Sequence, residues 1–215
     1  MILIPELRDM IIVSGFGRCG TSLVMQMLAA AGISCCGKYP AFEDDFVMRG
    51  AASAVWQDYV GPRAVKVIYP AALLPDAALP ARGIWLDRDC REQARSQVKF
   101  IGVNHVIANK RAAVRAFSRR LLADRPGALR ALGKTCAIGY RVLSFEDIIL
   151  DSRGAAAKIA AWVGLPGEAV PAMSEVVRFR SPRCYNGLME IELMESTLSG
   201  CAPGSVALAA AEGKE

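Results

Sequence analysis

Residues 11–31 read IIVSGFGRCGTSLVMQMLAAA, and this stretch decides the class of fold. Ile11 to Ser14 predict a short buried strand, which runs directly into a turn with glycine at positions 15, 17 and 20. From Thr21 onward, apolar side chains recur at helical spacing: Val24, Met27, Leu28 and Ala31. A strand, a glycine-rich turn and a helix in direct succession predict an anion cradle, because backbone N–H groups and the positive end of the helix dipole point to one place.

The same alternation continues along the chain. We expect further strands over residues 33–36, 64–69, 83–86 and 137–143. We expect helices that run through Trp56 and Tyr59, over 91–101, over 110–123, and from a cap at Ser152 to Val163. This pattern predicts an α/β domain with a mainly parallel central sheet and helices on both faces. Ligands of such sheets bind outside the carboxyl ends of the strands, so the candidate residues are those that directly follow each strand.

Composition fits one globular domain over residues 1–215, with a core at about 11–166 and a tail that frays. Hydrophobic residues make up 53% and charged residues 22% of the chain. No apolar run reaches about 18 residues, so no membrane span is expected. The N-terminus lacks the features of a secretory signal, and the seven cysteines are an odd number, which together indicate reduced thiols in the cytoplasm. A single histidine argues against a histidine-rich metal site, and no bound metal is expected.

Positive charge is concentrated between Arg88 and Arg130, a segment that contains eleven Lys and Arg residues but only three Asp and Glu residues. Arg111, Arg115 and Arg119 share one outer face of a predicted helix. Arginine binds phosphate and sulfate groups in a bidentate manner, so this segment is either a solvated helix face or a surface for an anionic ligand or acceptor.

The glycine-rich turn differs from the Walker A motif GxxxxGK[ST]. Gly15, Gly20 and Ser22 have the required spacing, but Thr21 stands at the lysine position and Arg18 is the cation inside the loop. An enzyme that uses a nucleoside triphosphate with Mg²⁺ therefore fits less well. Asp87, at the end of GIWLD, still resembles a Walker B carboxylate, so a kinase-like phosphotransferase that uses ATP and Mg²⁺ stays open as an alternative.

Three segments together resemble the sulfotransferases that use 3′-phosphoadenosine 5′-phosphosulfate (PAPS). GFGRCGTSL at 15–23 resembles their 5′-phosphosulfate loop, although Gly17 replaces a proline and Cys19 a serine. WLDRDCREQARSQ at 85–97 resembles their 3′-phosphate site, with Arg88 followed eight residues later by Ser96. The third match is SFEDI at 144–148, followed after a predicted helix by WVGLP at 162–166, and it resembles the family's R-Y-E-D-L and F-L-G-L-P sequences.

This resemblance implies a three-layer P-loop-type fold and transfer of a sulfuryl group from PAPS to a hydroxyl or amine, without a metal. The residues that it places against PAPS, or against the product 3′-phosphoadenosine 5′-phosphate (PAP), are Gly17, Arg18, Cys19, Gly20, Thr21, Ser22, Arg88 and Ser96. A basic C-terminal segment covers the nucleotide in relatives, which implies a similar role for Arg178, Arg180 and Arg183 within 167–215; an exposed basic loop is the other interpretation. Cys19, at a helix N-terminus beside Arg18, should favour its thiolate, but we interpret it as a stand-in for serine.

The catalytic base is the point at which the sequence departs from part of the family. Many cytosolic members have K-T-H-L-P after a strand, and here the segment is Lys66-Val67-Ile68-Tyr69-Pro70, with isoleucine at the histidine position. Other branches use a glutamate after the first βα unit, which implies Glu43, with Asp44 and Asp45 as alternatives. Arg18, Glu43 and Lys66 are thus the expected catalytic residues, with Lys66 on the sulfonate or bridging oxygen.

The partner is expected to be a small-molecule, carbohydrate or peptide acceptor and not a nucleic acid, and the oligomeric state is left open. Because the histidine is missing and the loop serine is replaced, a non-catalytic protein that binds an anionic nucleotide is a further alternative.

Overall fold

The computed structural model describes residues 8–49, 53–102 and 109–178. The chain divides into two units, Met1–Cys184 and Tyr185–Glu215, and every described residue belongs to the first. The strands are β1 (Met10–Gly15), β2 (Ala64–Ile68), β3 (Ala81–Asp87) and β4 (Gly139–Ser144). The helices are α1 (Thr21–Ala30), α2 (Asp45–Met48), α3 (Ser53–Val60), α4 (Pro70–Leu73), α5 (Cys90–Gly102), α6 (Lys110–Thr135), α7 (Phe145–Leu150), α8 (Ser152–Val163), the 3-10 helix η1 (Gly167–Ala169) and α9 (Val170–Glu175).

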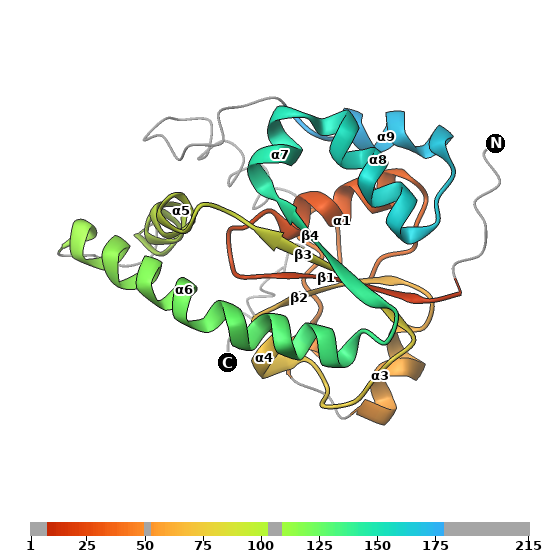
Figure 1. Cartoon of the computed structure of the whole chain (residues 1–215), viewed down its shortest axis with the longest axis horizontal. Helices are drawn as coiled ribbons and strands as arrows, with labels where there is room; N and C mark the ends of the chain where they lie inside the picture. Colours follow the sequence, from red (N-terminus) through yellow and green to blue (C-terminus); the bar gives the residue numbers. More distant parts are fainter. Residues whose placement is uncertain (1–7, 50–52, 103–108, 179–215) are drawn as a thin grey trace, which may run out of the picture. The chain divides into compact units, whose positions relative to one another are not determined.

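The four strands form one parallel sheet in the order β2-β1-β3-β4. Helices α1, α7, α8 and α9 cover one face, and α3, α4 and α6 cover the other, so the expected three-layer α/β architecture is confirmed (Figure 1). The chain leaves β1 toward β2 on one side and leaves β3 toward β4 on the other. The carboxyl ends of β1 and β3 therefore lie side by side at a switch point of the sheet, where such folds bind ligands.

Two apolar cores, one on each face, hold the sheet in place. Successive side chains of β1 alternate between them: Ile11 and Val13 pack with α1, α8 and α9, whereas Met10 and Ile12 pack with α3 and α6. All six residues of β1 are buried, as a central parallel strand covered on both faces requires. The anion loop thus starts from a rigid strand.

Three sequence-based expectations for the secondary structure are wrong in detail. Residues 33–36 form no strand: Cys35 makes an isolated bridge to Ala64, and the chain then turns at Gly37, whose φ is 79°. The helix expected over 110–123 continues to Thr135 as α6. Helix α8 is capped by Asp151, whose side chain accepts a hydrogen bond from the Gly154 N–H, and Ser152 is its first residue.

In the part of the chain that the structure describes, no helix is long and apolar enough to cross a membrane.

Candidate functional site

The anion loop, residues 16–20, joins β1 to α1 at the switch point. Two of its residues have left-handed backbone conformations, Arg18 with φ 68° and Gly20 with φ 102°. The Cys19 N–H donates to the Phe16 carbonyl over 3.3 Å, which closes the turn. A side chain at position 20 would place its Cβ 2.6 Å from the Phe145 ring, so both the conformation and the space require glycine here.

The basic residues at the ends of β1 and β3 meet at this loop. Arg18 donates through Nε to the buried Ser96 hydroxyl on α5 over 3.1 Å. Arg88, which follows β3, donates through Nη1 to the Arg18 carbonyl over 3.0 Å, and its guanidinium stacks on the Phe145 ring at 4.4 Å. Arg18 therefore contacts Arg88 and Ser96, which follow it by 70 and 78 positions in the sequence. The loop and the Arg88–Ser96 pair, expected as two anion sites, are thus connected by hydrogen bonds through Arg18.

Gln93 on α5 also holds the loop, and the sequence motifs did not single it out. Its buried amide Nε2 donates to the Phe16 carbonyl over 3.2 Å and to the Gly17 carbonyl over 2.9 Å. Its position three residues before Ser96 puts both side chains on one face of α5, and that spacing is the signal in the sequence that could have identified it.

The expectation of a thiolate at Cys19 is wrong. The side chain is fully buried in the core beside α1, and this burial raises the pKa of the Cys19 thiol to about 12. A Cβ built on Gly15 would lie 2.5 Å from the Cys19 Sγ. The thiol therefore packs inward against β1 and not toward an anion on the surface. The five cysteines within the described residues are all free thiols.

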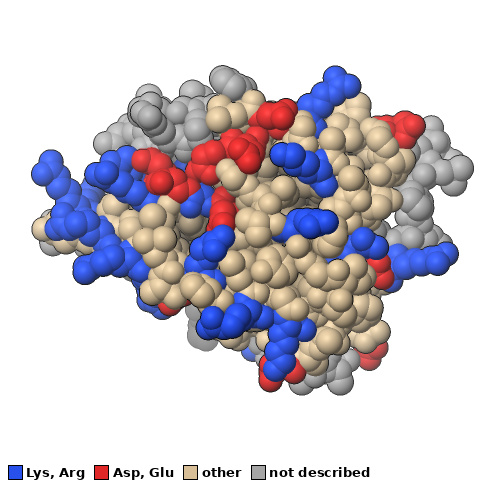
Figure 2. Space-filling model, viewed as in Figure 1, with Lys and Arg blue, Asp and Glu red and all other residues tan. Residues whose placement is uncertain are grey.

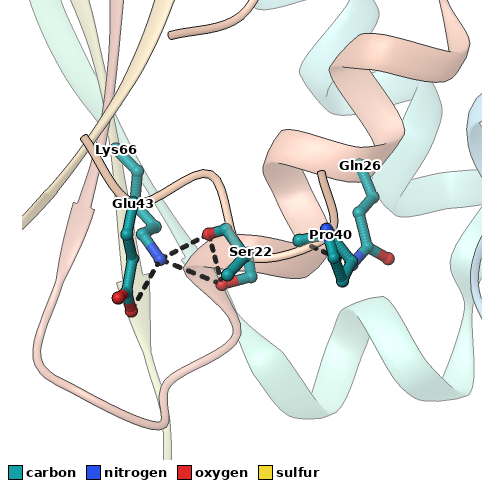
Figure 3. A network of polar contacts seen from close by, with 6 residues as sticks. Ser22, Gln26, Pro40, Glu43 and Lys66 are labelled. Atoms are coloured by element: carbon teal, nitrogen blue, oxygen red, sulfur yellow. Dashed lines mark hydrogen bonds and ion pairs between the residues drawn. The ribbon is translucent and has the colours of Figure 1, made fainter. Parts of the chain in front are cut away.

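Lys66 on β2 connects the start of α1 with the loop that carries Glu43 (Figure 3). Its Nζ donates to the Ser22 hydroxyl over 3.2 Å, to the Ala41 carbonyl, and to Oε1 of Glu43 over 3.5 Å. The Lys66 side chain is only 5% exposed, whereas that of Glu43 is 64% exposed. Burial lowers the pKa of Lys66, and the nearby Glu43 carboxylate opposes part of this effect. Two of the three expected catalytic residues are thus in contact.

The loop over residues 37–44 is fastened to α1 at two further points. The Ser22 hydroxyl donates to the Ala41 carbonyl over 3.1 Å, and the Gln26 amide donates to the Pro40 carbonyl over 3.0 Å (Figure 3). Lys38 and Glu43 face each other across an isolated antiparallel bridge. These contacts fasten the loop that carries Glu43 to the N-terminal part of α1, which directly follows the anion loop.

Asp44 has a structural role and does not fit the role of a base. Its buried carboxylate caps α2 by accepting hydrogen bonds from the Phe46 and Val47 N–H groups, and it also accepts from the Tyr59 hydroxyl over 2.9 Å. Asp45 is exposed in the first turn of α2. Glu43 is therefore the carboxylate that combines exposure with contact to Lys66.

Asp87, the Walker B-like residue, is engaged by two side chains. Arg125 on α6 binds both of its carboxylate oxygens, and the Trp85 indole donates to Oδ1 over 2.7 Å. Burial alone would raise the pKa of Asp87, but these hydrogen bonds outweigh it and hold the pKa below its ordinary value. Among the residues that the structure describes, no group of three or more His, Cys, Asp or Glu is placed to hold a metal ion.

Arg183 and Arg180 lie outside the described residues, and Arg178 is exposed just after α9. Their expected contact with a nucleotide stays a prediction.

Comparison with known proteins gives no match to a family model and none to a curated protein sequence. Solved structures do match. Mouse sulfotransferase SULT7A1 complexed with PAP aligns with a TM-score of 0.55 at 12% identity, over 80% of this chain and 69% of that one. The chain has the sulfotransferase fold. Sulfotransferase STF9 from Mycobacterium avium aligns with a TM-score of 0.50 at 14% identity, over 91% of this chain and 77% of that one. At such identity the likeness concerns the sulfotransferase fold alone, and the reaction has to be argued from the residues of the site.

Proposed function

We propose that this protein transfers a sulfuryl group from PAPS to a hydroxyl or amine of an acceptor. The observation that carries the proposal is the junction at Arg18, where the glycine-rich loop, Arg88 and the buried Ser96 hydroxyl meet at the switch point. PAPS has an anionic group at each end of its ribose unit, and this site offers donors to both. The mouse neighbour was crystallised with PAP, which agrees with this interpretation.

The residues of the site fit PAPS in distinct roles. The backbone N–H groups at Gly20, Thr21 and Ser22 start α1 and suit the 5′-phosphate, with Gly17 and Cys19 contributing backbone only. Arg88 and Ser96 suit the 3′-phosphate. PAPS supplies the sulfuryl group and a phosphate leaving group. Arg18 within the anion loop and Lys66 on β2 provide positive charge. This charge stabilises the negative charge that develops on the leaving oxygen.

Glu43 is the proposed base. Its exposed carboxylate lies 3.5 Å from the Lys66 ammonium, which also donates to Ser22 at the start of α1, and these contacts support the proposal. The acceptor hydroxyl loses its proton to this carboxylate as its oxygen attacks sulfur. Ile68 cannot take this role, and Asp44 is committed to the cap of α2.

A phosphotransferase that uses ATP and Mg²⁺ has less support, because both Asp87 oxygens already accept hydrogen bonds from Arg125 and Trp85. A non-catalytic nucleotide-binding protein would explain the loop, Arg88 and Ser96 equally well. It would not explain why an exposed carboxylate is paired with a buried lysine beside the loop. A small-molecule, carbohydrate or peptide acceptor, cover of the nucleotide by residues 167–215, and a cytoplasmic location remain part of the proposal.

The test is transfer of isotopically labelled sulfur from PAPS to a panel of phenols, sugars and tyrosine peptides, with a metal chelator present. The expected result is a labelled product with at least one acceptor class. Arg18→Ala should lower turnover by about a hundredfold or more, and more than it weakens PAP binding, since the charge on the leaving oxygen is largest in the transition state. PAP binding without transfer to any acceptor would support the non-catalytic alternative.

A further inference from the structure

Two polar side chains from different elements overhang the anion loop at Gly17. A Cβ on Gly17 would lie 3.1 Å from Oε1 of Gln97, on α5, and 3.6 Å from the hydroxyl of Tyr69, which directly follows β2. Gly17 is not among the glycines with positive φ, so its backbone conformation does not require glycine. A side chain at position 17 would therefore be in tight contact with the Gln97 amide and in ordinary contact with the Tyr69 hydroxyl.

Tyr69 is held at this place by an uncommon backbone conformation. Its φ is 59°, and its N–H donates to the Gly15 carbonyl over 3.2 Å. Its ring packs against Phe16, with the centroids 5.7 Å apart. Within the described residues, only Arg18, Phe42 and Tyr69 have positive φ without being glycine, and all three lie in the loops of the site. Backbone strain of this kind concentrates at functional sites.

Within the described residues, neither the Tyr69 hydroxyl nor the Gln97 amide makes a side-chain hydrogen bond, in contrast to the neighbouring Gln93. Tyr69 is 42% exposed, so the residue is open to solvent. Rotation of the Gln97 amide by half a turn presents its NH₂ group at the position of its oxygen.

We propose that Tyr69 and Gln97 form the subsite for the sulfuryl group, holding its oxygens through the tyrosine O–H and the glutamine N–H above Gly17. This inference rests on the proposed function and adds the residues that distinguish PAPS from PAP. A sulfuryl group carries one negative charge spread over three oxygens, so neutral donors suit it. The phosphates carry more charge and face Arg88, Arg18 and the backbone amides instead. Tyr69 and Gln97 therefore contribute to the binding of PAPS and not to that of PAP.

Calorimetry with PAPS and with PAP tests this proposal without a known acceptor. Tyr69→Phe removes only the hydroxyl and should weaken PAPS binding by about three- to tenfold, the range for one hydrogen bond, with PAP affinity unchanged. Gly17→Ala fills the space below both side chains and should weaken PAPS more than PAP. Matched controls are Tyr140→Phe on β4 and Gly167→Ala, since a Cβ on Gly167 meets nothing within 4 Å.

The outcomes separate the two proposals. If the wild-type protein binds neither nucleotide, the proposed function fails, and this inference fails with it. If the wild type binds both nucleotides but Tyr69→Phe and Gly17→Ala change the two affinities equally, or change neither, the sulfuryl subsite is overturned while the proposed function stands.

Discussion

Glu43 and Lys66 are in contact, but they differ in exposure and therefore in the role that each can take. The exposed carboxylate can exchange protons with an acceptor, whereas the buried ammonium cannot reach solvent freely. Lys66 donates to Ser22 at the start of α1 and to the loop that carries Glu43. Its charge is therefore placed against the anion loop, although burial makes that charge costly.

Glu43→Gln keeps the shape of the side chain and removes its basicity. Turnover should fall by about a hundredfold or more, because a positioned base contributes about 10²–10⁴-fold, while PAP affinity should stay within about twofold of the wild-type value. Asp45→Asn is the matched control, since Asp45 is an exposed carboxylate close in sequence, in the first turn of α2. Full activity of Glu43→Gln with the best acceptor of the panel would exclude Glu43 as the base.

Lys66→Met should change how stability depends on pH. The folded state lowers the pKa of Lys66 from its ordinary value of 10.5, so the unfolded chain binds more protons in the window below that value. Wild-type stability relative to Lys66→Met should therefore increase as the pH rises toward 10.5. Urea unfolding of both proteins at each pH gives the difference.

The exposed Lys158→Met variant is the control for this pH series, and its difference from the wild type should not change with pH. A stability difference between wild type and Lys66→Met that stays constant, or that shrinks with rising pH, would contradict the effect of burial on Lys66.

At the scale of elements, sequence periodicity predicted most strands and helices, because each has an apolar face with the matching period. The extension of α6 could not be predicted in this way, since Pro126 normally ends a helix. Pro126 has no N–H to donate to the Leu122 carbonyl, and Leu122 lies on the exposed side of the helix. Beyond it, Ala128 and Leu132 are buried against the sheet, and Arg125 binds Asp87. Packing therefore outweighs the proline.

The residues of the site were only partly predictable. The loop, Arg88 and Ser96 stand in recognisable motifs. The contacts of Gln97 and Tyr69 with the loop depend on how α5 and β2 pack beside it, and no local pattern encodes that packing. The burial of Cys19 likewise follows from the inward direction of its side chain, which residue type alone did not indicate.

Gln93→Met tests how α5 supports the loop. The variant loses two hydrogen bonds to loop carbonyls and keeps a buried side chain of similar length. PAP affinity should fall by about tenfold, and the melting temperature should fall by a few degrees, because net hydrogen bonds contribute about 0.5–1.5 kcal/mol each. Gln57→Met, on the exposed side of α3, should change neither. Unchanged PAP binding by Gln93→Met would show that the loop keeps its conformation without α5.

At the scale of the molecule, the parallel sheet brings the ends of β1 and β3 together, and with them the loop and Arg88. Basic side chains gather over α5 and the N-terminal half of α6, as the charge distribution of the sequence predicted (Figure 2). Helix α5 also carries Gln93, Ser96 and Gln97, so the element that supports the loop belongs to the basic part of the surface. The fold and the charge both favour a ligand with more than one anionic group.

The central claim is that one site recognises both phosphates of PAP without a metal, and calorimetry in the presence of a chelator tests it most directly. PAP should bind, and AMP, which lacks the 3′-phosphate, should bind at least about tenfold more weakly, since charge-assisted hydrogen bonds contribute about 1.5–3 kcal/mol each. Arg88→Ala should reduce PAP affinity to the level of AMP, whereas Arg91→Ala, an exposed arginine of α5, should not. Equal affinities for PAP and AMP, or tighter binding of ATP with Mg²⁺ in a parallel titration, would contradict the account.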